Sequence, residues 1–473
     1  MEPTDNFFLQ FGEEYTSEEK ELLAKIETCR SYIDDGQLFS NYEYIEETVT
    51  ECSELGFFDG LIEILDAILE VMPYKAEFWQ IKGIYYNNYL SFDKAEECLL
   101  KSLEIAPNDI ETLINLAIAQ ENLEKFEDAI NSLYKARDLE PYNPEVMYNL
   151  GSNYNKLGKN EIAIEFFKKA YDLDNTYIEP LFDLAFVYDS LLNYDEALQT
   201  FDLIGDGDND FYSVHYHKGI IYLKQEKYEE AINELKLSLV NFDRHADAWF
   251  NLGVAFAKLN NFEEAADSFY KAVEIDPFDK TAIFALAQSY EDLGKHFEAL
   301  YYYKKSIEAN HEIAESHYNR GHIYFLEENY YKALMEYKKA IINDPEMLDA
   351  YVEKADTEFN LGRINDAIVS YITAIEKGDT SYETWFKLGV IYSNFGELNR
   401  AIDYFNETIQ RNPKFSYAYY EKAKVLFNME KQDEVVENLR IAIKYSPEIR
   451  NNLVNDFKDI KTIDLFKQFF DKK

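Results

Sequence analysis

Histidine is the residue type in this sequence best suited to acid–base or metal chemistry, and the chain has seven of them. His215 and His217 lie two residues apart, so a helix would direct them to different faces. His317 and His322 lie five apart and are no better matched as metal ligands. The sequence also lacks HExxH, a phosphate-binding glycine loop and a nucleophile elbow. It therefore predicts no enzyme, no metal site and no cofactor, with His215 and His317 packed in place of aromatic residues.

A run of aspartates raises the question of calcium. Asp206, Asp208 and Asp210 are spaced like the first ligands of a calcium-binding loop. Such a loop needs glycine at its sixth position and glutamate at its twelfth, where this sequence has Phe211 and His217. Two nearby glycines would instead shorten a helix, so we interpret the run as a local bend.

The cysteines and the amino-terminal sequence indicate the cellular compartment of the protein. Cys29, Cys52 and Cys98 are odd in number and include no CxxC pair, so reduced thiols in a cytosolic protein are the simplest account. The amino terminus has no basic region followed by an apolar run, unlike a signal peptide. No stretch approaches the roughly 20 apolar residues of a membrane span. We predict a cytoplasmic protein without membrane insertion.

The net charge of −43 restricts the class of partner. Binding to a nucleic-acid backbone requires an excess of lysine and arginine, so we expect no nucleic-acid partner. The charge favours solubility and would attract basic partners at low ionic strength. It is also uneven, with a net −15 over residues 1–75 and +1 over residues 416–473.

The elements that would position any site are helices in a 34-residue repeat. Residues 246–279 contain two stretches in which apolar or small residues follow the i, i+4, i+7 spacing of one helical face, separated by a short polar turn. The stretches are marked by Trp249, Gly253 and Phe256 and by Ala265, Phe269 and Ala272. A single helix pair cannot bury both faces, so copies should stack on either side.

Those copies are present without insertion or deletion. Position 8 is Gly or Ala in eleven successive units, position 20 is Ala in ten of them, and all three tryptophans fall at position 4. Small residues at positions 8 and 20 let the helices approach, and large residues at position 24 fill the remaining space. The predicted units are 76–109, 110–143, 144–177, 178–211, 212–245, 246–279, 280–313, 314–347, 348–381, 382–415 and 416–449. We further expect a capping helix region in 1–41, a degenerate unit in 42–75 and a capping helix in 450–473.

These units resemble the tetratricopeptide repeat, with Trp249, Gly253, Phe256, Ala265 and a proline near position 32 as the characteristic residues. The resemblance implies an all-α fold, a right-handed α-solenoid (superhelix) of stacked antiparallel helix pairs. It also implies protein binding through a concave groove lined by the first helices.

The resemblance places ligand contacts at positions 2, 5, 6, 9, 12 and 13. Here position 5 is mostly aromatic, position 6 is often asparagine and position 2 is mostly acidic. The candidate partner-binding residues are Asn115, Tyr148, Asn149, Phe182, Tyr216, Phe250, Asn251, Phe284, Tyr318, Asn319, Phe386 and Tyr420. The same residue types also occur in the family without any ligand, and acidic residues favour a helix start in any case.

The predicted function is that of a non-enzymatic scaffold or adaptor that binds a peptide or helix of a partner protein, neutral or basic rather than acidic. The lysine and asparagine with which some members grip a chaperone's terminal carboxylate are absent from positions 5 and 9. An alternative is a structural protein that self-assembles end to end through its terminal repeats.

Overall fold

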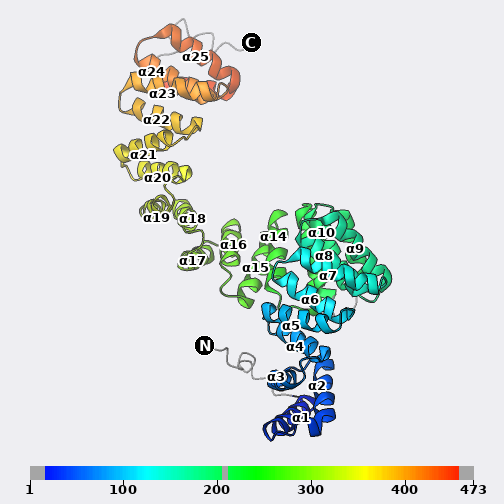
Figure 1. Ribbon diagram of the computed structural model, residues 1–473. Helices are drawn as coiled ribbons and strands as arrows, with labels where there is room; N and C mark the ends of the chain where they lie inside the picture. Colours follow the sequence, from blue (N-terminus) through cyan, green and yellow to red (C-terminus); the bar gives the residue numbers. More distant parts are fainter. Residues whose placement is uncertain (1–15, 205–210, 458–473) are drawn as a thin grey trace. The chain divides into compact units, whose positions relative to one another are not determined.

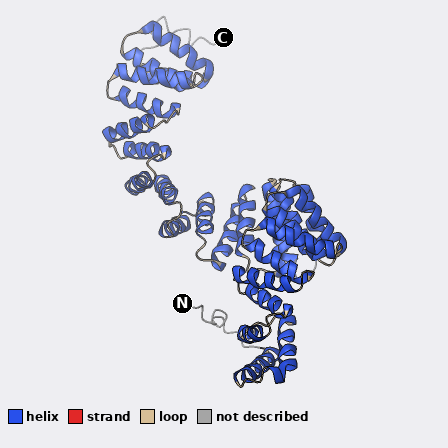
Figure 2. Cartoon of the chain, in the orientation of Figure 1, coloured by secondary structure: helices blue, strands red, loops and turns tan. Residues whose placement is uncertain are grey.

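The computed structural model describes residues 16–204 and 211–457. Within these ranges every regular element is helical and no strand occurs (Figure 2). None of the helices in the described ranges is both long and apolar enough to cross a lipid bilayer.

The chain divides between Ile221 and Tyr222 into two units, which we describe separately. Figure 1 follows the helices of each unit along the chain. Unit 1 contains α1 (Ser17–Asp34), α2 (Tyr42–Glu54), α3 (Leu61–Val71), α4 (Ala76–Asn88), α5 (Phe92–Ile105), α6 (Ile110–Asn122), α7 (Phe126–Leu139), α8 (Pro144–Lys156), α9 (Asn160–Leu173), α10 (Glu179–Ser190) and α11 (Tyr194–Ile204). The helix α12 (Phe211–Lys224) spans the division.

Unit 2 continues the same alternation of paired helices. It contains α13 (Tyr228–Asn241), α14 (Ala246–Lys258), α15 (Phe262–Ile275), α16 (Lys280–Asp292), α17 (His296–Glu308), α18 (Ile313–Leu326), α19 (Tyr330–Asn343), α20 (Leu348–Asn360), α21 (Ile364–Glu376), α22 (Tyr382–Asn394), α23 (Leu398–Arg411), α24 (Ser416–Asn428), α25 (Gln432–Tyr445) and α26 (Leu453–Asp456). From α4 onward, each first helix begins within one residue of the start of a 34-residue unit. The fold is an all-α solenoid of stacked helix pairs.

A left-handed residue at position 15 separates the two helices of each pair. Glycine occupies this position in only some units, although a non-glycine residue there costs roughly 1–2 kcal/mol. The next amide closes the turn; Lys125 N, for example, donates to Gln120 O at 2.8 Å. The residues with positive φ at this position are Gly56, Leu90, Glu124, Gly158, Leu192, Glu226, Asn260, Gly294, Glu328, Gly362, Gly396 and Glu430.

The core alternates small and large side chains between the two helices. A Cβ atom added at Gly151 would lie 2.6 Å from Phe167 Cδ1, and one at Gly253 would lie 2.8 Å from Phe269 Cδ1. Distances this short force the neighbour to move. The predicted role of the small residue at position 8 is therefore confirmed at these pairs.

Aromatic residues at position 4 link successive repeats. Their ring N–H or hydroxyl donates to a carbonyl at position 32 of the preceding repeat, at 2.7–3.3 Å. The donors are Trp79, Trp249, Tyr351 and Tyr419, and the acceptors are Pro73, Asp243, Pro345 and Pro413. Trp385 Nε1, in contrast, is buried and has no hydrogen-bond partner.

The chain's own helices cover the first and last helix pairs. At the amino end, Thr16 and Glu19 form a capping box, and α1 buries Leu22 and Ile26 against α2 and α3. At the other end, Leu453 and Phe457 are buried against α24 and α25. The predicted bend at 205–210 and most of the predicted cap at 450–473 lie outside the described residues.

Candidate functional site

The first helices form the inner side of each stack. In unit 1, α4 lies close to α6, α6 to α8 and α8 to α10, and in unit 2, α18 lies close to α20 and α22 to α24. Second helices of successive repeats make no comparable approach in the described parts of the chain. In a curved stack of repeats, helices on the inner side lie closer together than helices on the outer side. The first helices therefore line the inner face.

The aromatic residues at position 5 are partly buried packing residues that retain some exposed surface on this face. Each ring meets the ring at position 24 of its own repeat, with centroids 5.5–6.1 Å apart and tilted or edge-to-face geometry. The pairs are Tyr148–Phe167, Phe182–Phe201, Phe250–Phe269, Phe284–Tyr303, Tyr318–Tyr337 and Phe386–Phe405. Tyr216 instead contacts His217, at 5.2 Å.

The four candidate asparagines are engaged by the protein itself. Asn115, Asn149 and Asn251 each donate to the carbonyl four residues earlier in their own helix, at 2.8–3.0 Å. Asn319 donates to the hydroxyl of Tyr303 at 3.0 Å. Each amide thus makes a hydrogen bond within the protein, although a side-chain amide has more than one donor and acceptor site.

Tyr420 differs from the other position-5 residues because the carboxyl-terminal segment covers it. Its side chain is only 2% exposed. The Tyr420 hydroxyl donates to Asp456 Oδ2 at 2.6 Å, and its ring meets Phe457 at 5.9 Å. We therefore leave Tyr420 out of the functional proposal below.

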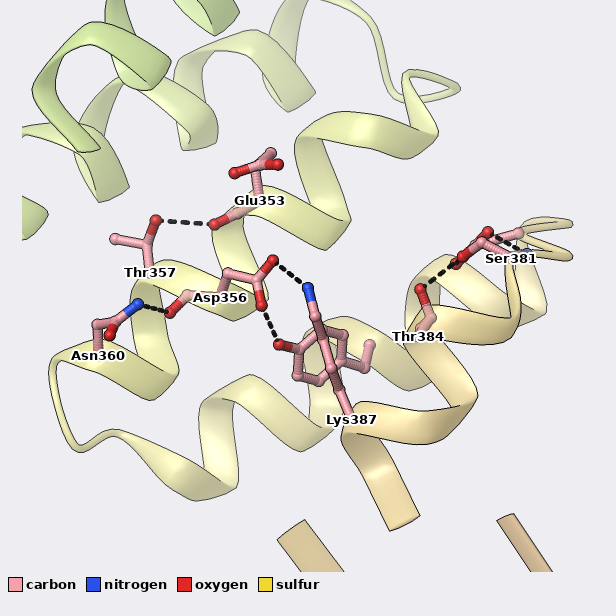
Figure 3. A network of polar contacts seen from close by, with 9 residues as sticks. Glu353, Asp356, Thr357, Asn360, Ser381, Thr384 and Lys387 are labelled. Carbon is pink, nitrogen blue, oxygen red and sulfur yellow. Dashed lines mark hydrogen bonds and ion pairs between the residues drawn. The ribbon is translucent and has the colours of Figure 1, made fainter. Parts of the chain in front are cut away.

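Unit 2 carries a network of polar contacts on its inner face (Figure 3). Asp356, on α20, accepts a hydrogen bond from the Tyr371 hydroxyl at 2.5 Å. The other oxygen of Asp356 pairs with Lys387 Nζ, from the first helix of the next repeat, at 2.6 Å. The Asp356 carboxylate thus links α21, the second helix of its own repeat, to α22, the first helix of the next repeat.

An analogous arrangement occurs two repeats earlier. Glu291 Oε2 accepts a hydrogen bond from the Tyr303 hydroxyl at 2.5 Å, and Oε1 lies 3.3 Å from His322 Nδ1. The hydrogen bond with Glu291 raises the pKa of His322, although burial opposes the shift. As in the Asp356 network, a tyrosine at position 24 and a cationic group from the next repeat satisfy an inner carboxylate.

Glu353, on the same helix as Asp356, lacks such a pairing. The Glu353 carboxylate makes no hydrogen bond or ion pair with any described residue, and Figure 3 shows it apart from the Asp356–Lys387 contact. Burial raises the pKa of Glu353 and the charge of Asp356 adds to the shift, whereas the charges of Lys387 and His322 oppose it. The hydroxyl of Tyr337 is also buried, and it has no hydrogen-bond partner among the described residues. Burial and then the charge of Glu353 raise the pKa of Tyr337, so the two groups are close enough to interact.

Unit 1 carries its own inner carboxylate cluster. Glu121, on α6, accepts from Asn153 Nδ2 at 2.7 Å and pairs with Lys156 Nζ at 2.5 Å, both from α8. Burial raises the pKa of Asp183 on the next first helix, and the charge of Glu121 raises it further. This face therefore already contains a cation for the Glu121 carboxylate.

The histidines at position 4 are buried, as the sequence predicts. His317 is 8% exposed, and its Nδ1 lies 2.7 Å from Glu336 Oε2. Lys339 Nζ and Arg320 also approach Glu336, at 2.9 and 3.5 Å. No group of three or more histidine, cysteine, aspartate or glutamate side chains suited to holding a metal ion occurs among the described residues.

The repeated helix pairs and their small-to-large packing define the class of protein as a helical repeat scaffold. Models of one family, the tetratricopeptide repeat, match residues 144–177, 214–280, 314–346 and 382–415. These segments of the chain are tetratricopeptide repeats.

Solved structures of related folds have low sequence identity to this chain. MamA from Desulfovibrio magneticus RS-1 is 23% identical over 35% of this chain and 94% of its own, with a TM-score of 0.33. YrrB, described as a protein with an unusual peptide-binding site, is 23% identical over 40% and 98%, with a TM-score of 0.35. The Cut9–Hcn1 complex is 15% identical over 93% and 98%, with a TM-score of 0.39. No curated protein sequence matches the chain.

The sequence pattern did not identify the unpaired carboxylate of Glu353. A signal for it exists in the sequence, because position 24 is tyrosine in three consecutive repeats, at Tyr303, Tyr337 and Tyr371, and leucine or phenylalanine in the others. A hydroxyl at this buried position needs a polar partner, which predicts polar groups on the neighbouring first helices.

Proposed function

We propose that this chain is a non-enzymatic scaffold whose inner face holds a segment of a partner protein. The observation that carries the proposal is the Glu353 carboxylate, whose pKa is raised by burial although the charges of Lys387 and His322 oppose the shift. A partly buried carboxylate without a direct ion pair carries a desolvation cost that is only partly recovered, and a lysine or arginine from a partner would offset it.

Aromatic rings on the inner face of the two preceding repeats fit the apolar part of such a segment. Tyr318 and Phe284 are partly buried at position 5 of successive repeats, so each leaves some ring surface exposed on the inner face. Burial raises the pKa of Tyr318 to about 12, and the charge of Glu353 contributes to the shift. The proposed ligand is therefore an extended or helical segment with a basic side chain next to apolar ones.

The test compares capture of partners from the native host by wild type, Glu353→Gln and the double variant Tyr318→Ala/Phe284→Ala. We expect one partner to be enriched by wild type and strongly reduced with both variants. Glu274→Gln, an exposed residue on α15, is the matched control and should leave capture unchanged.

Overlapping short peptides from the captured partner then locate the bound segment. We expect the binding peptide to contain lysine or arginine, and replacing that residue by glutamine should remove its dependence on Glu353. Equal recovery with all variants, or a binding peptide without a basic residue, would rule out the inner-face proposal.

A further inference from the structure

The second helices of three consecutive repeats in unit 2 have an outer surface unlike that of the other repeats. At positions 18 and 22, on the outer side of the second helix, the other eight repeats carry only aspartate, glutamate, asparagine or glutamine. In repeats 280–313, 314–347 and 348–381, five of these six positions are apolar or aromatic. With Ile342, they form what we call the outer strip: Phe297, Tyr301, Tyr331, Met335, Ile342 and Val369.

These side chains are exposed and not merely apolar. Phe297 is 82% exposed, Ile342 77% and Tyr331 67%. The remaining three members of the outer strip are 50–63% exposed. Single exposed apolar residues are ordinary on a protein surface, but apolar residues that recur at equivalent exposed positions of three successive repeats indicate an interaction site.

Two cations lie over rings of the outer strip, although the whole chain has a net charge of −43. Lys305 lies 4.9 Å from the centre of the Tyr301 ring, and Arg363 lies 5.8 Å from that of Tyr331. The helix α19 contains three lysines and a single acidic residue, Glu336, which is only 5% exposed. Lysines thus outnumber exposed carboxylates on α19 itself, so this helix complements a ligand that combines apolar side chains with carboxylates.

Residues 1–15 of the chain have this complementary chemistry. Their sequence, MEPTDNFFLQFGEEY, contains three phenylalanines and a leucine, four acidic residues and no lysine or arginine. We propose that residues 1–15 of one copy of the chain bind the outer strip of a second copy. The proposal does not depend on the inner-face function, because it uses the opposite side of the repeats.

The proposed contact joins two different surfaces, which determines the kind of assembly. A bound pair keeps one unoccupied outer strip, on one copy, and one unoccupied amino-terminal segment, on the other. Such a heterologous contact continues into longer chains of molecules unless the geometry closes a ring. The expected species are therefore a series of oligomers that grows with concentration.

The first test is sedimentation equilibrium of the full chain from about 1 to about 100 µM, a range that detects micromolar association. We expect the average mass of the wild type to rise above the 55.6 kDa of one chain. Tyr331→Glu/Met335→Asp should remain at that mass. Because repeat 246–279 naturally has Glu263 and Asp267 at the equivalent positions, this variant is expected to fold, and circular dichroism checks that it does.

The second test addresses the amino-terminal segment. Phe7→Ser/Phe8→Ser/Phe11→Ser should also stay monomeric, whereas Asp267→Asn, outside the outer strip, should associate like the wild type. A labelled peptide of residues 1–15 should bind the wild type and bind Tyr331→Glu/Met335→Asp at least about tenfold more weakly.

Three results would overturn the proposal. One is a wild type that is monomeric over the whole concentration range, even if the peptide binds. The others are undiminished association of either the strip variant or the amino-terminal variant. Partner capture through Glu353 is measured separately, so either proposal can fail without the other.

Discussion

Glu336 is a buried charge whose environment keeps it ionised. Burial alone would raise the pKa of Glu336, but hydrogen bonds from His317 and Lys339 and the charge of Arg320 lower it to about 2. A carboxyl whose folded-state pKa is lowered stabilises the fold above its unfolded pKa, and this contribution disappears as the pH falls through the folded value. For Glu336 the affected window runs from near pH 4.5 down to about 2.

We therefore predict a specific acid sensitivity for the wild type that Glu336→Gln lacks. At neutral pH the variant should be less stable by about 1.5–3 kcal/mol, because it removes hydrogen bonds to a charged group. On acidification below about pH 4.5, the two unfolding temperatures should converge. Thermal unfolding followed by circular dichroism measures both effects, with the exposed Glu298→Gln as control. Curves that stay parallel down to pH 3 would contradict the prediction.

At the scale of the helix pair, close packing between position 8 and position 24 holds the repeat together. Glycine is usually unfavourable within a helix, by about 1 kcal/mol relative to alanine. Gly151 is nevertheless required by the ring of Phe167, which occupies the space that a Cβ atom would need. Side-chain packing thus outweighs helix propensity at this position.

We predict that Gly151→Ala destabilises the protein by about 1–3 kcal/mol, the usual cost of overpacking, despite the better helix propensity of alanine. Combining it with Phe167→Leu should recover part of the loss, because alanine at position 8 faces leucine at position 24 in the repeat that contains Ala117 and Leu133. Chemical denaturation of the wild type, both single variants and the double variant gives the coupling energy. Additive effects would show that the two residues do not compete for space.

At the scale of the whole molecule, charge opposes the compact state. A net charge of −43 over 473 residues produces self-repulsion that the folded repeats must overcome. Raising the salt concentration from about 10 to about 100 mM shortens the Debye length from about 30 to about 10 Å and screens this repulsion.

We accordingly predict that the unfolding temperature rises as sodium chloride is increased from about 10 to about 100 mM. Salt screens the many long-range repulsions between surface charges, whereas the few inner ion pairs are partly buried and are screened less. Calorimetry at a low protein concentration measures the change. The same rise with potassium chloride would indicate screening and not binding of a particular cation. An unfolding temperature that falls with both salts would mean that attractive ion pairs dominate.

The sequence alone determined the repeat, because helical spacing and the alternation of small and large residues are local and recur every 34 residues. The sequence also pointed to partly exposed aromatic residues on the first helices, because the 34-residue repeat fixes which residue of each first helix is at position 5. It could not separate Tyr420 from the others, because only the folded chain brings Asp456 and Phe457 onto that ring.

Only the tertiary structure decided which polar groups remain unsatisfied and which apolar groups remain exposed. Asp356 and Glu353 lie on one helix, yet Lys387 from the next repeat reaches only Asp356. Likewise, the repeat register places Phe297 at position 18, but only the folded helix shows that its side chain is 82% exposed. Both properties depend on neighbours contributed by other helices, so they become visible only once the repeats are stacked.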